Sequence, residues 1–432
     1  MNVALIVVDT LGARHLGCYT PGLSNSPEID LLAKSGAKFE NSFATSSWTK
    51  PSLASIFTSL MPIRHKSIGP ALKLPIPVET VAELLQRRGY STLGVVSHTL
   101  LGPRSGFQQG FDEYRQMNTK KKVHSSITSN LVSDEGIRLL KKHLQKGDRK
   151  PFFLFLHYFD PHFNYRDHED YEFTKGYEGR LRSGMSLNAL ERAKKSMTAE
   201  DINYLKALYH EEIAYTDAQI GRMVDFLDAS GLRENTLIIV TADHGEGFLE
   251  HGMLGHTSSL YDELVRVPLI LNLPGRIAPS TFKSPVTGLD LLPTVADYLD
   301  IKPAQTWEGI SLKSSLEKQE EPKRESPVFM EVSYVTQKRI ISPDIVALVD
   351  DQRKIIFDLQ RKRWHVYDTV LDPFDSTNLA EGSRGDIITY REKLQPLIDL
   401  HRGLKDELFE EPQNEIEMQK DEIKQLKTLG YL

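Results

Sequence analysis

The chain has 432 residues, 40% of them hydrophobic and 26% charged, which allows one large α/β domain or two domains. Its net charge of −6 argues against nucleic acid as an obligate partner, because binding to phosphates needs a basic excess. The single cysteine, Cys18, excludes an intramolecular disulfide framework and a cysteine-based zinc cluster.

No stretch approaches the roughly 18 consecutive apolar residues that span a bilayer. The N-terminus passes directly into an apolar run and lacks a charged segment followed by a cleavage site. We therefore predict a soluble, cytoplasmic chain without a signal peptide or a membrane span. The three lysines at 120–122 are interpreted as part of a solvated loop.

Residues 3–9 form the first predicted strand, an apolar run without alternation that is typical of a strand buried on both faces. The run ends in Asp9. In a doubly wound parallel sheet, side chains just past the carboxyl end of a strand line the ligand crevice, so Asp9 is a candidate ligand. Residues 27–36 follow as a short helix, with Ser26 as a candidate cap and Pro27 in its first turn.

Thr49 precedes a run of apolar residues at helical spacing, Leu53, Ile56, Phe57 and Leu60. This pattern places Thr49 at or just before a helix N-terminus, where backbone N–H groups and the macrodipole favour an anion. A hydroxyl held there can attack an ester if a cation stabilises its alkoxide. The alternative is that Thr49 is simply an N-cap.

The next predicted elements are a helix over residues 79–89 and a strand over 91–97, which ends beside His98. A further buried strand, residues 152–156, leads into three potential ligands, His157, Asp160 and His162. The alternative is that Asp160 and the following proline only form a structural turn and bind nothing.

Residues 163–196 are polar and show no period, so we predict a long excursion over the mouth of an active site. A long helix follows over residues 199–230 and ends at Gly231.

The strand over residues 236–242 is again apolar throughout and ends in Asp243 and His244, a carboxylate and an imidazole that suit a transition-metal or zinc site. The alternative is a plain junction between a strand and a turn, in which Asp243 caps the turn and Gly245 allows the chain to change direction. The elements predicted after it are a loop containing His251 and His256, a helix over 258–264, a strand over 267–272 and a helix over 289–299.

Residues 305–326 are rich in Lys, Glu, Pro and Ser and are predicted as a surface connection. Four short alternating runs then indicate an antiparallel meander at residues 328–332, 345–349, 353–358 and 363–367. A closing helix over residues 389–404 is expected to pack on it.

Taken together, the chain resembles the sulfatase family of the alkaline phosphatase superfamily. The resemblance spans essentially the whole chain and is carried by Val-Val-Asp9-Thr, Ser26-Pro-Glu-Ile-Asp30, Pro51-Ser52, Thr241-Ala-Asp243-His244-Gly-Glu, Leu260-Tyr-Asp-Glu before Arg266-Val-Pro-Leu, and Leu429-Gly-Tyr-Leu. It implies an α/β fold with a large, mostly parallel sheet flanked by helices, as in alkaline phosphatase, and a smaller C-terminal antiparallel α+β part. We place the catalytic domain at residues 1–320 and the C-terminal subdomain at 321–432.

The resemblance also implies a site that hydrolyses or transfers a sulfuryl or phosphoryl group beside a divalent cation. Carried over by position, Asp9, Asp243 and His244 match the metal ligands, and Thr49 matches the nucleophile that also contacts the metal. One ion is expected, Mn²⁺, Zn²⁺ or Ca²⁺, with room for a second. Direct ligation or one bridging water requires Thr49 to lie within about 6 Å of the other ligands.

The chain departs from true sulfatases at the nucleophile. Their motif is Cys or Ser-x-Pro-Ser-Arg, in which the first residue is oxidised to formylglycine, whereas this chain has Thr49-Lys-Pro-Ser-Leu53. The methyl group on the threonine Cβ prevents that oxidation, and Leu53 lacks the family's guanidinium. A second family Asp is Thr10, a Lys near position 98 is missing, and another family Lys is His256.

What remains resembles the threonine-nucleophile branch, namely the phosphoethanolamine and phosphoglycerol transferases and related phosphodiesterases. His162 and His256 match histidines that contact the phosphoryl group or the leaving group in that branch. The transferases carry membrane-spanning segments that this chain lacks, so hydrolysis of a soluble ester is predicted over lipid-linked transfer.

The predicted mechanism is attack of the Thr49 oxygen on phosphorus, with a metal lowering the pKa of its hydroxyl. His162 or His256, each expected to titrate near neutrality, protonates the leaving group or binds a second cation. Secondary candidates are Thr10, His98, His157, Asp160 and His251.

The expected substrate is a small-molecule or glycan ester, either a phosphodiester or a phosphomonoester. Two alternatives are a sulfuric ester hydrolase that works without formylglycine and a catalytically inactive binding protein of the same fold. A metal-requiring isomerase or mutase of the superfamily is a third. The sequence leaves the oligomeric state open.

Overall fold

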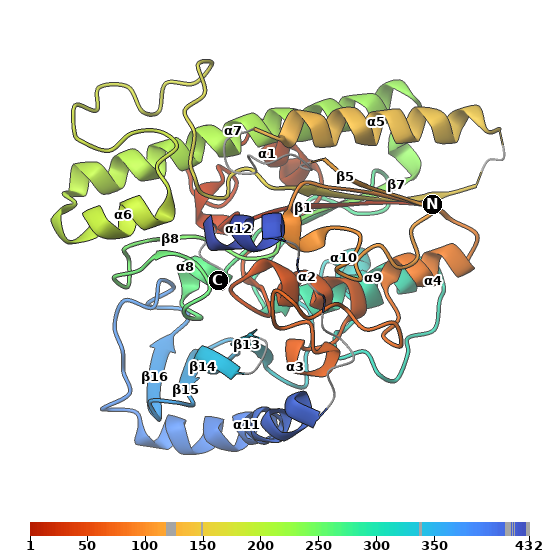
Figure 1. Ribbon diagram of the computed structural model, residues 1–432. Coiled ribbons are helices and arrows are strands. Elements are labelled where there is room, and N and C mark those ends of the chain that lie inside the picture. Colours follow the sequence, from red (N-terminus) through yellow and green to blue (C-terminus); the bar gives the residue numbers. More distant parts are fainter. Residues whose placement is uncertain are drawn as a thin grey trace.

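The computed structural model describes residues 1–117, 127–147, 150–336, 339–410, 416, 418 and 420–428. Its largest unit is an eight-stranded sheet with the strand order β11-β2-β10-β7-β1-β6-β4-β5 (Figure 1). The strands are β1 (Asn2–Val8), β2 (Ala37–Phe39), β4 (Ser91–Val96), β5 (Glu113–Gln116), β6 (Phe152–Tyr158), β7 (Thr236–Ala242), β10 (Leu269–Asn272) and β11 (Ser280–Phe282).

The five strands from β7 to β5 run parallel, whereas β10 is antiparallel to both of its neighbours and β11 is parallel to β2. All residues of β1 are buried, and they alternate between two cores. Ala4, Ile6 and Val8 belong to one core, and Val3, Leu5 and Val7 to the other. The apolar run without alternation therefore reflects a strand covered on both faces, as predicted.

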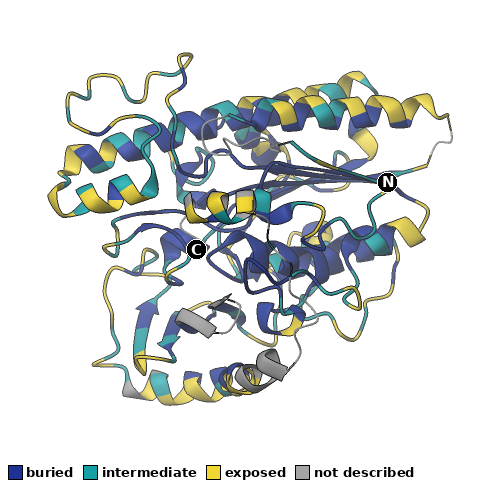
Figure 2. Cartoon of the chain, in the orientation of Figure 1, coloured by how far each residue is buried: buried dark blue, intermediate teal, exposed yellow. Residues whose placement is uncertain are grey.

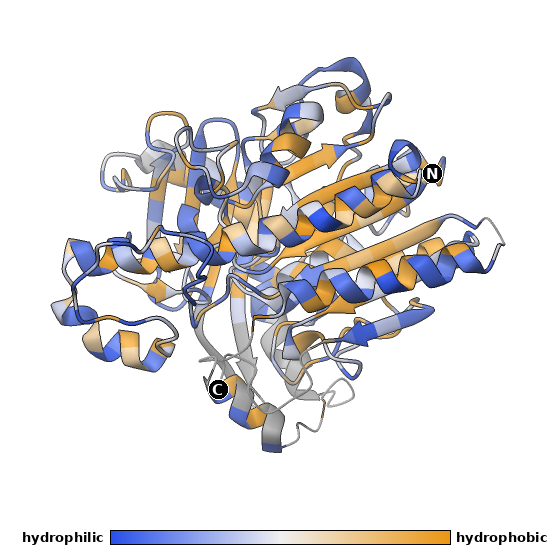
Figure 3. Ribbon diagram, turned by 90° about the horizontal axis from the view of Figure 1, so that it is seen from above, coloured by the Kyte–Doolittle hydropathy of each residue, from blue (hydrophilic) through white to orange (hydrophobic). Residues whose placement is uncertain are grey.

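Helices cover both faces of the sheet. One face carries α1 (Pro27–Ser35), α5 (Ser129–Gln145) and α7 (Ala199–Ala229), and the other carries α2 (Thr49–Thr58), α4 (Val81–Arg87), α9 (Leu291–Tyr298) and α10 (Lys313–Lys318) (Figure 1). Seen from above, α5 and α7 have mixed polar and apolar surfaces over apolar strands (Figure 3). The remaining short helices are η1 (Ala13–His15), α3 (Pro62–His65), η2 (Thr99–Leu101), α6 (Leu187–Ala193), η3 (Lys194–Ser196), η4 (Arg233–Asn235), α8 (Asp262–Val265) and η5 (Gly288–Asp290).

The C-terminal part is a four-stranded antiparallel sheet of β13 (Val328–Thr336), β14 (Arg339–Val349), β15 (Arg353–Asp358) and β16 (Arg363–Asp368), packed against α11 (Arg384–Glu410). A last helix, α12 (Lys420–Thr428), and two small strand pairs complete the fold: β3 (Ser42–Phe43) with β12 (Val286–Thr287), and β8 (Gly247–Phe248) with β9 (Leu254–Gly255). The predicted fold class, a mostly parallel α/β sheet with a C-terminal antiparallel α+β part, is confirmed. The division at residue 320 stays a prediction.

Three local expectations differ from the structure. The helix predicted over residues 258–264 is only the single turn α8, and the aperiodic segment 163–196 contains α6 near its end. Ser26 makes no capping hydrogen bond. Instead, the first turn of α1 donates its N–H groups at Glu28 and Ile29 to the carboxylate of Asp217, at 3.0 and 2.8 Å, because α7 crosses that helix end.

None of the helices in the described ranges has both the length and the apolar character that crossing a bilayer requires. The lysines at 120–122 and the closing Leu429-Gly-Tyr-Leu lie outside the described residues.

Candidate active site

The ends of β1 and β7 place Asp9, Asp243 and His244 together. The pairing of Val8 with Ala242 puts Asp9 beside Asp243 at the carboxyl edge of the sheet. One ligand atom from each of the three residues lies within 4.8 Å of the others. The Nε2 atom of His244 is 3.5 Å from an Asp9 oxygen and 3.7 Å from an Asp243 oxygen. All three side chains are buried.

Thr49 reaches this cluster from α2, which lies on the face of the sheet opposite α1, α5 and α7. It is the first residue of α2, with Trp48 as the cap residue, so the interpretation of Thr49 as an N-cap is wrong. Its buried Oγ1 lies 3.4 Å from His244 Nε2. This separation is well inside the ~6 Å required for a shared ion.

Local hydrogen bonds orient the cluster. His244 donates its Nδ1–H to the carbonyl of Gly245 at 2.9 Å, which leaves the Nε2 lone pair facing Thr49 and Asp9. Asp243 Oδ1 accepts the N–H groups of Thr10 and His244, at 3.2 and 2.9 Å. Gly245 is required at this turn, because a Cβ there would lie 2.1 Å from the backbone oxygen of Glu263.

The residues present fit a divalent cation. Both carboxylate oxygens of Asp9 and Oδ2 of Asp243 are buried without a hydrogen-bond partner among the described residues. Burying carboxylates without partners is costly unless a cation compensates them. Burial, followed by the charge of Asp243, raises the pKa of Asp9 well above its usual value. Two carboxylates, an imidazole and a hydroxyl form a donor set that suits a divalent metal ion.

His157 and His98 border the same carboxylates. The His157 Nε2 atom lies 3.8 Å from Asp9 and 3.9 Å from Asp243, and neither ring nitrogen has a hydrogen-bond partner in the described part of the chain. His98 accepts the Leu100 N–H on Nδ1, so its Nε2 carries a hydrogen when the ring is neutral, 3.9 Å from Asp9 Oδ2. His157 is therefore available as a ligand, and neutral His98 as a hydrogen-bond donor.

The structure also brings His162 and His256 to the cluster. Their ring centroids are 4.9 Å apart, and the His256 centroid is 4.4 Å from that of His244. His162 donates Nδ1–H to the Phe163 carbonyl at 2.8 Å. Burial, and then the neighbouring His244, lowers the pKa of His256 well below 6.5, so the expectation that His256 titrates near neutrality is wrong.

Three secondary candidates make other contacts. Asp160 accepts the N–H groups of Thr128 and Ser129 at 2.8 Å each and so closes the start of α5. His251 contacts Glu263 at 2.7 Å and the Asp375 carbonyl at 2.8 Å through its two ring nitrogens. Thr10 contributes its backbone, because its N–H reaches Asp243 and its carbonyl accepts from the Tyr209 hydroxyl at 2.6 Å.

Two charged residues that the sequence analysis did not select adjoin the site. Glu246 lies 3.1 Å from His256 Nδ1, and burial raises the pKa of Glu246 to about 8. This pair therefore carries no net charge at neutral pH. Lys50 follows Thr49 and is fully buried; its Nζ donates to the Pro70 carbonyl at 3.0 Å, and burial lowers its pKa to about 7. The sequence signal for Lys50 was its place beside Thr49, and for Glu246 its place at the end of the motif that contains Asp243 and His244.

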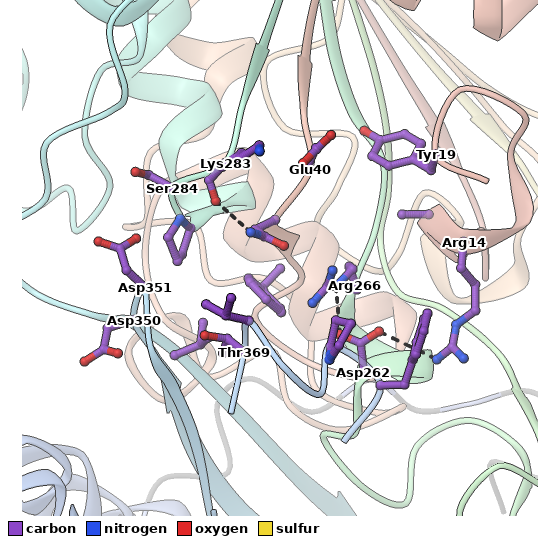
Figure 4. A pocket seen from close by; sticks show the side chains of 18 of the residues that line it. Arg14, Tyr19, Glu40, Asp262, Arg266, Lys283, Ser284, Asp350, Asp351 and Thr369 are labelled. Atoms are coloured by element: carbon purple, nitrogen blue, oxygen red, sulfur yellow. Dashed lines mark hydrogen bonds and ion pairs between the residues drawn. The ribbon is translucent and has the colours of Figure 1, made fainter. Parts of the chain in front are cut away.

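Two cavities lie near these elements. One of about 270 Å³ is lined by Lys50 and Thr99, which directly follow Thr49 and His98 in the chain. The other, of about 610 Å³, opens between the main sheet and the C-terminal strands and is lined by side chains such as Arg14, Asp262 and Arg266 (Figure 4). None of the predicted site residues lines the larger cavity.

Comparisons with known proteins show which family the chain belongs to. Residues 1–301 match the family model described as Sulfatase, and residues 249–399 match one described as N-sulphoglucosamine sulphohydrolase, C-terminal. The chain is 25% identical to the choline-sulfatase of Rhizobium meliloti over 437 residues, which cover 89% of this chain and 83% of that protein.

Two solved structures share the fold. The phosphonate monoester hydrolase of Agrobacterium radiobacter aligns with a TM-score of 0.75 at 20% identity, covering 93% of this chain and 96% of the other. A protein in complex with its substrate D-glucosamine-2-N,6-O-disulfate aligns with a TM-score of 0.72 at 19% identity, covering 96% and 99%. The chain therefore belongs to the sulfatase family of the alkaline phosphatase superfamily and is an ester hydrolase.

Proposed function

We propose that this chain hydrolyses phosphate esters through a covalent intermediate on Thr49, beside a divalent cation held by Asp9, Asp243, His244 and Thr49. The observation that carries the proposal is the position of Thr49 Oγ1, 3.4 Å from His244 Nε2 at the N-terminus of α2. A bound cation would lower the pKa of the Thr49 hydroxyl and offset charge on the ester oxygens.

The chain's own residues supply the remaining steps. The deprotonated Thr49 oxygen attacks phosphorus, and the bond to the leaving oxygen breaks. His162 donates Nδ1–H to the Phe163 carbonyl, so in its protonated form it also carries a hydrogen on Nε2, which it delivers to the leaving alkoxide and so becomes neutral. His98, through its Nε2–H, and neutral His256 each offer an N–H to the non-bridging oxygens. Water then releases the phosphoryl group from Thr49.

The choice of phosphate over sulfate rests on the nucleophile. A threonine cannot become formylglycine, and Leu53 stands where true sulfatases carry an arginine. A sulfuric ester hydrolase acting with a bare threonine stays the alternative, because the relatives include sulfatases. The relative in complex with a sulfated glucosamine supports a sugar ester as the substrate class.

The test compares p-nitrophenyl phosphate, bis-p-nitrophenyl phosphate and p-nitrophenyl sulfate with added Mn²⁺, Zn²⁺ or Ca²⁺. We expect a phosphate ester to turn over faster than the sulfate ester. Thr49→Ala should lose about 10⁴-fold in kcat, as loss of a covalent nucleophile does, and Thr49→Ser should retain part of it. Mass spectrometry should find a phosphoryl adduct on the Thr49 peptide.

Thr58→Ala is the matched control, because Thr58 ends the same helix and its hydroxyl donates to the Ala54 carbonyl at 2.7 Å. It should keep wild-type turnover. Faster hydrolysis of the sulfate ester would favour the sulfatase alternative. Full activity of Thr49→Ala would overturn the covalent mechanism.

A further inference from the structure

A second cavity with a chemical character of its own lies in the C-terminal part. It has a volume of about 470 Å³ and is lined by residues of β14, β15, β16, the turn between β15 and β16, and α11. None of the catalytic residues lines it. Figure 2 shows α11 along one edge of the molecule, with exposed residues on its outer side.

The cavity is rich in positive charge although the chain carries a net charge of −6. Lys362, Arg391 and Arg402 line it, and all three are exposed. Lys362 lies at the end of the turn at residues 359–362, which joins β15 to β16. Lys362 and Arg391 form no ion pair with the described residues, whereas Arg402 lies 3.2 Å from Asp399. At least two cations are thus available to an anion in solution.

An aromatic surface adjoins these cations. Trp364 lines the cavity and is stacked on Phe357, with ring centroids 4.2 Å apart and an interplanar angle of 21°. The stack fixes the orientation of the indole. A flat aromatic ring offers an apolar face to the C–H groups of a sugar ring, while lysine and arginine pair with sulfate or phosphate oxygens.

The one carboxylate that lines the base of the cavity is already paired. Asp344 is the only carboxylate among its described lining residues, and it accepts from His401 Nδ1 at 3.1 Å. His401 also donates Nε2–H to Glu331. Burial lowers the pKa of His401, but Glu331 and Asp344 raise it to about 9, so the imidazole is positively charged at neutral pH.

The cleft in Figure 4 provides a contrast within the same molecule. Its lining mixes cations with carboxylates, and Arg266 donates to Asp262 at 2.7 Å within it. Cations already paired in this way have little attraction left for a further anion. The cavity beside α11 differs in that its cations outnumber its carboxylate.

We propose that the cavity beside α11 is a non-catalytic binding site for a sulfated oligosaccharide, in which Trp364 stacks on a sugar ring and Lys362 and Arg391 pair with its sulfate groups. This site does not depend on the Thr49 chemistry.

The test is isothermal titration of the full chain with a heparin-derived hexasaccharide, in about 50 mM salt so that screening stays weak. Lys362→Ala/Arg391→Ala should bind the hexasaccharide about tenfold more weakly, because two charge-assisted contacts are lost. Trp364→Ala should also bind more weakly, with Trp364→Phe intermediate. Turnover of a small aryl ester should be unchanged in all three variants.

Lys302→Ala/Lys323→Ala is the matched control, since it removes two exposed lysines from outside the cavity and should bind like the wild type. The desulfated hexasaccharide should bind at least tenfold more weakly than the sulfated one. Three outcomes would overturn the proposal: no binding by the wild type, equal affinity of the wild type and Lys362→Ala/Arg391→Ala, or equal binding of a single-stranded DNA of the same charge.

Discussion

Two buried clusters of histidine and carboxylate side chains occur in this chain, and they differ in how their oxygens are satisfied. In the His401 cluster (Glu331, Asp344 and His401), Glu331 accepts from His401 and from the Ile63 N–H, and Asp344 accepts from His401 and Ser333. In the catalytic cluster (Asp9, Asp243, His244 and Thr49), both oxygens of Asp9 and one of Asp243 have no donor among the described residues.

The difference separates a structural role from a binding role. The His401 cluster carries its own counter-charge and joins α11 and the C-terminal sheet to the backbone of α3. The catalytic cluster brings two carboxylates together and holds His244 with a lone pair toward them. A buried arrangement of that kind destabilises the chain by itself and becomes favourable when a cation binds.

Among variants that change the charge of either cluster, the largest effect is expected from Asp9→Asn. It should lower turnover by about 10³-fold, because it removes a charged ligand, yet stabilise the metal-free chain by about 1–3 kcal/mol, because an unpaired buried charge is gone. Kinetics with added metal and urea unfolding in the presence of a chelator would measure both. If metal-free Asp9→Asn were less stable than the metal-free wild type, the unpaired Asp9 carboxylate would not be destabilising the chain.

The opposite pattern is expected in the His401 cluster. His401→Ala should leave Glu331 and Asp344 without their shared partner and cost about 3–5 kcal/mol of unfolding free energy, as breaking a buried pair does. Turnover of a small ester at low temperature should be unchanged. A large loss of turnover in folded His401→Ala would show that the two clusters are not separate in function.

A smaller effect is expected from Glu246→Gln, which sharpens the definition of the catalytic cluster. Glu246 orients the His256 ring. Loss of such an orienting contact typically lowers kcat/KM 10- to 100-fold, and we expect a loss of about tenfold here. Glu250→Gln is the control, because Glu250 pairs with Lys206 at 2.9 Å. Similar losses in both variants would assign the effect to general packing.

The smallest effect is a pH dependence of stability. The pKa of His401 is about 9 in the folded chain and lies near 6.5 when exposed. A raised folded pKa gives stability that is fully present below pH 6.5 and is lost as the pH rises through 9. Between these values the free energy of unfolding of the wild type should fall relative to His401→Gln by about 1 kcal/mol per pH unit. Parallel urea midpoints for the two proteins would contradict this.

The strands that carry the catalytic cluster could be predicted because their signal is local. Asp9 and Asp243 follow apolar runs, and parallel strands end at one edge of a sheet. Thr49 could be placed at a helix start from the spacing of the apolar residues behind it. The family resemblance supplied the grouping of these distant residues.

The other features could not be predicted from the sequence, because they depend on tertiary contacts. Lys50 and Glu246 are single charged residues whose burial is decided by segments far along the chain. Helix α5 is absent from the prediction; it contains Gly136, which would weaken a helix but here allows close approach to Leu156, 3.0 Å from where a Cβ would stand. The His401 cluster joins β13, β14 and α11, and no local pattern links them.

Binding of a divalent cation by the catalytic cluster can be measured by metal analysis of the purified chain. The chain would be stripped with a chelator, dialysed against Mn²⁺, Zn²⁺ or Ca²⁺, and its bound metal and melting temperature measured beside those of Asp9→Ala/Asp243→Ala. We predict tight binding and a raised melting temperature for the wild type with at least one of these ions, and neither for the double variant. A wild type that binds none of them, or a double variant that binds equally well, would contradict the account.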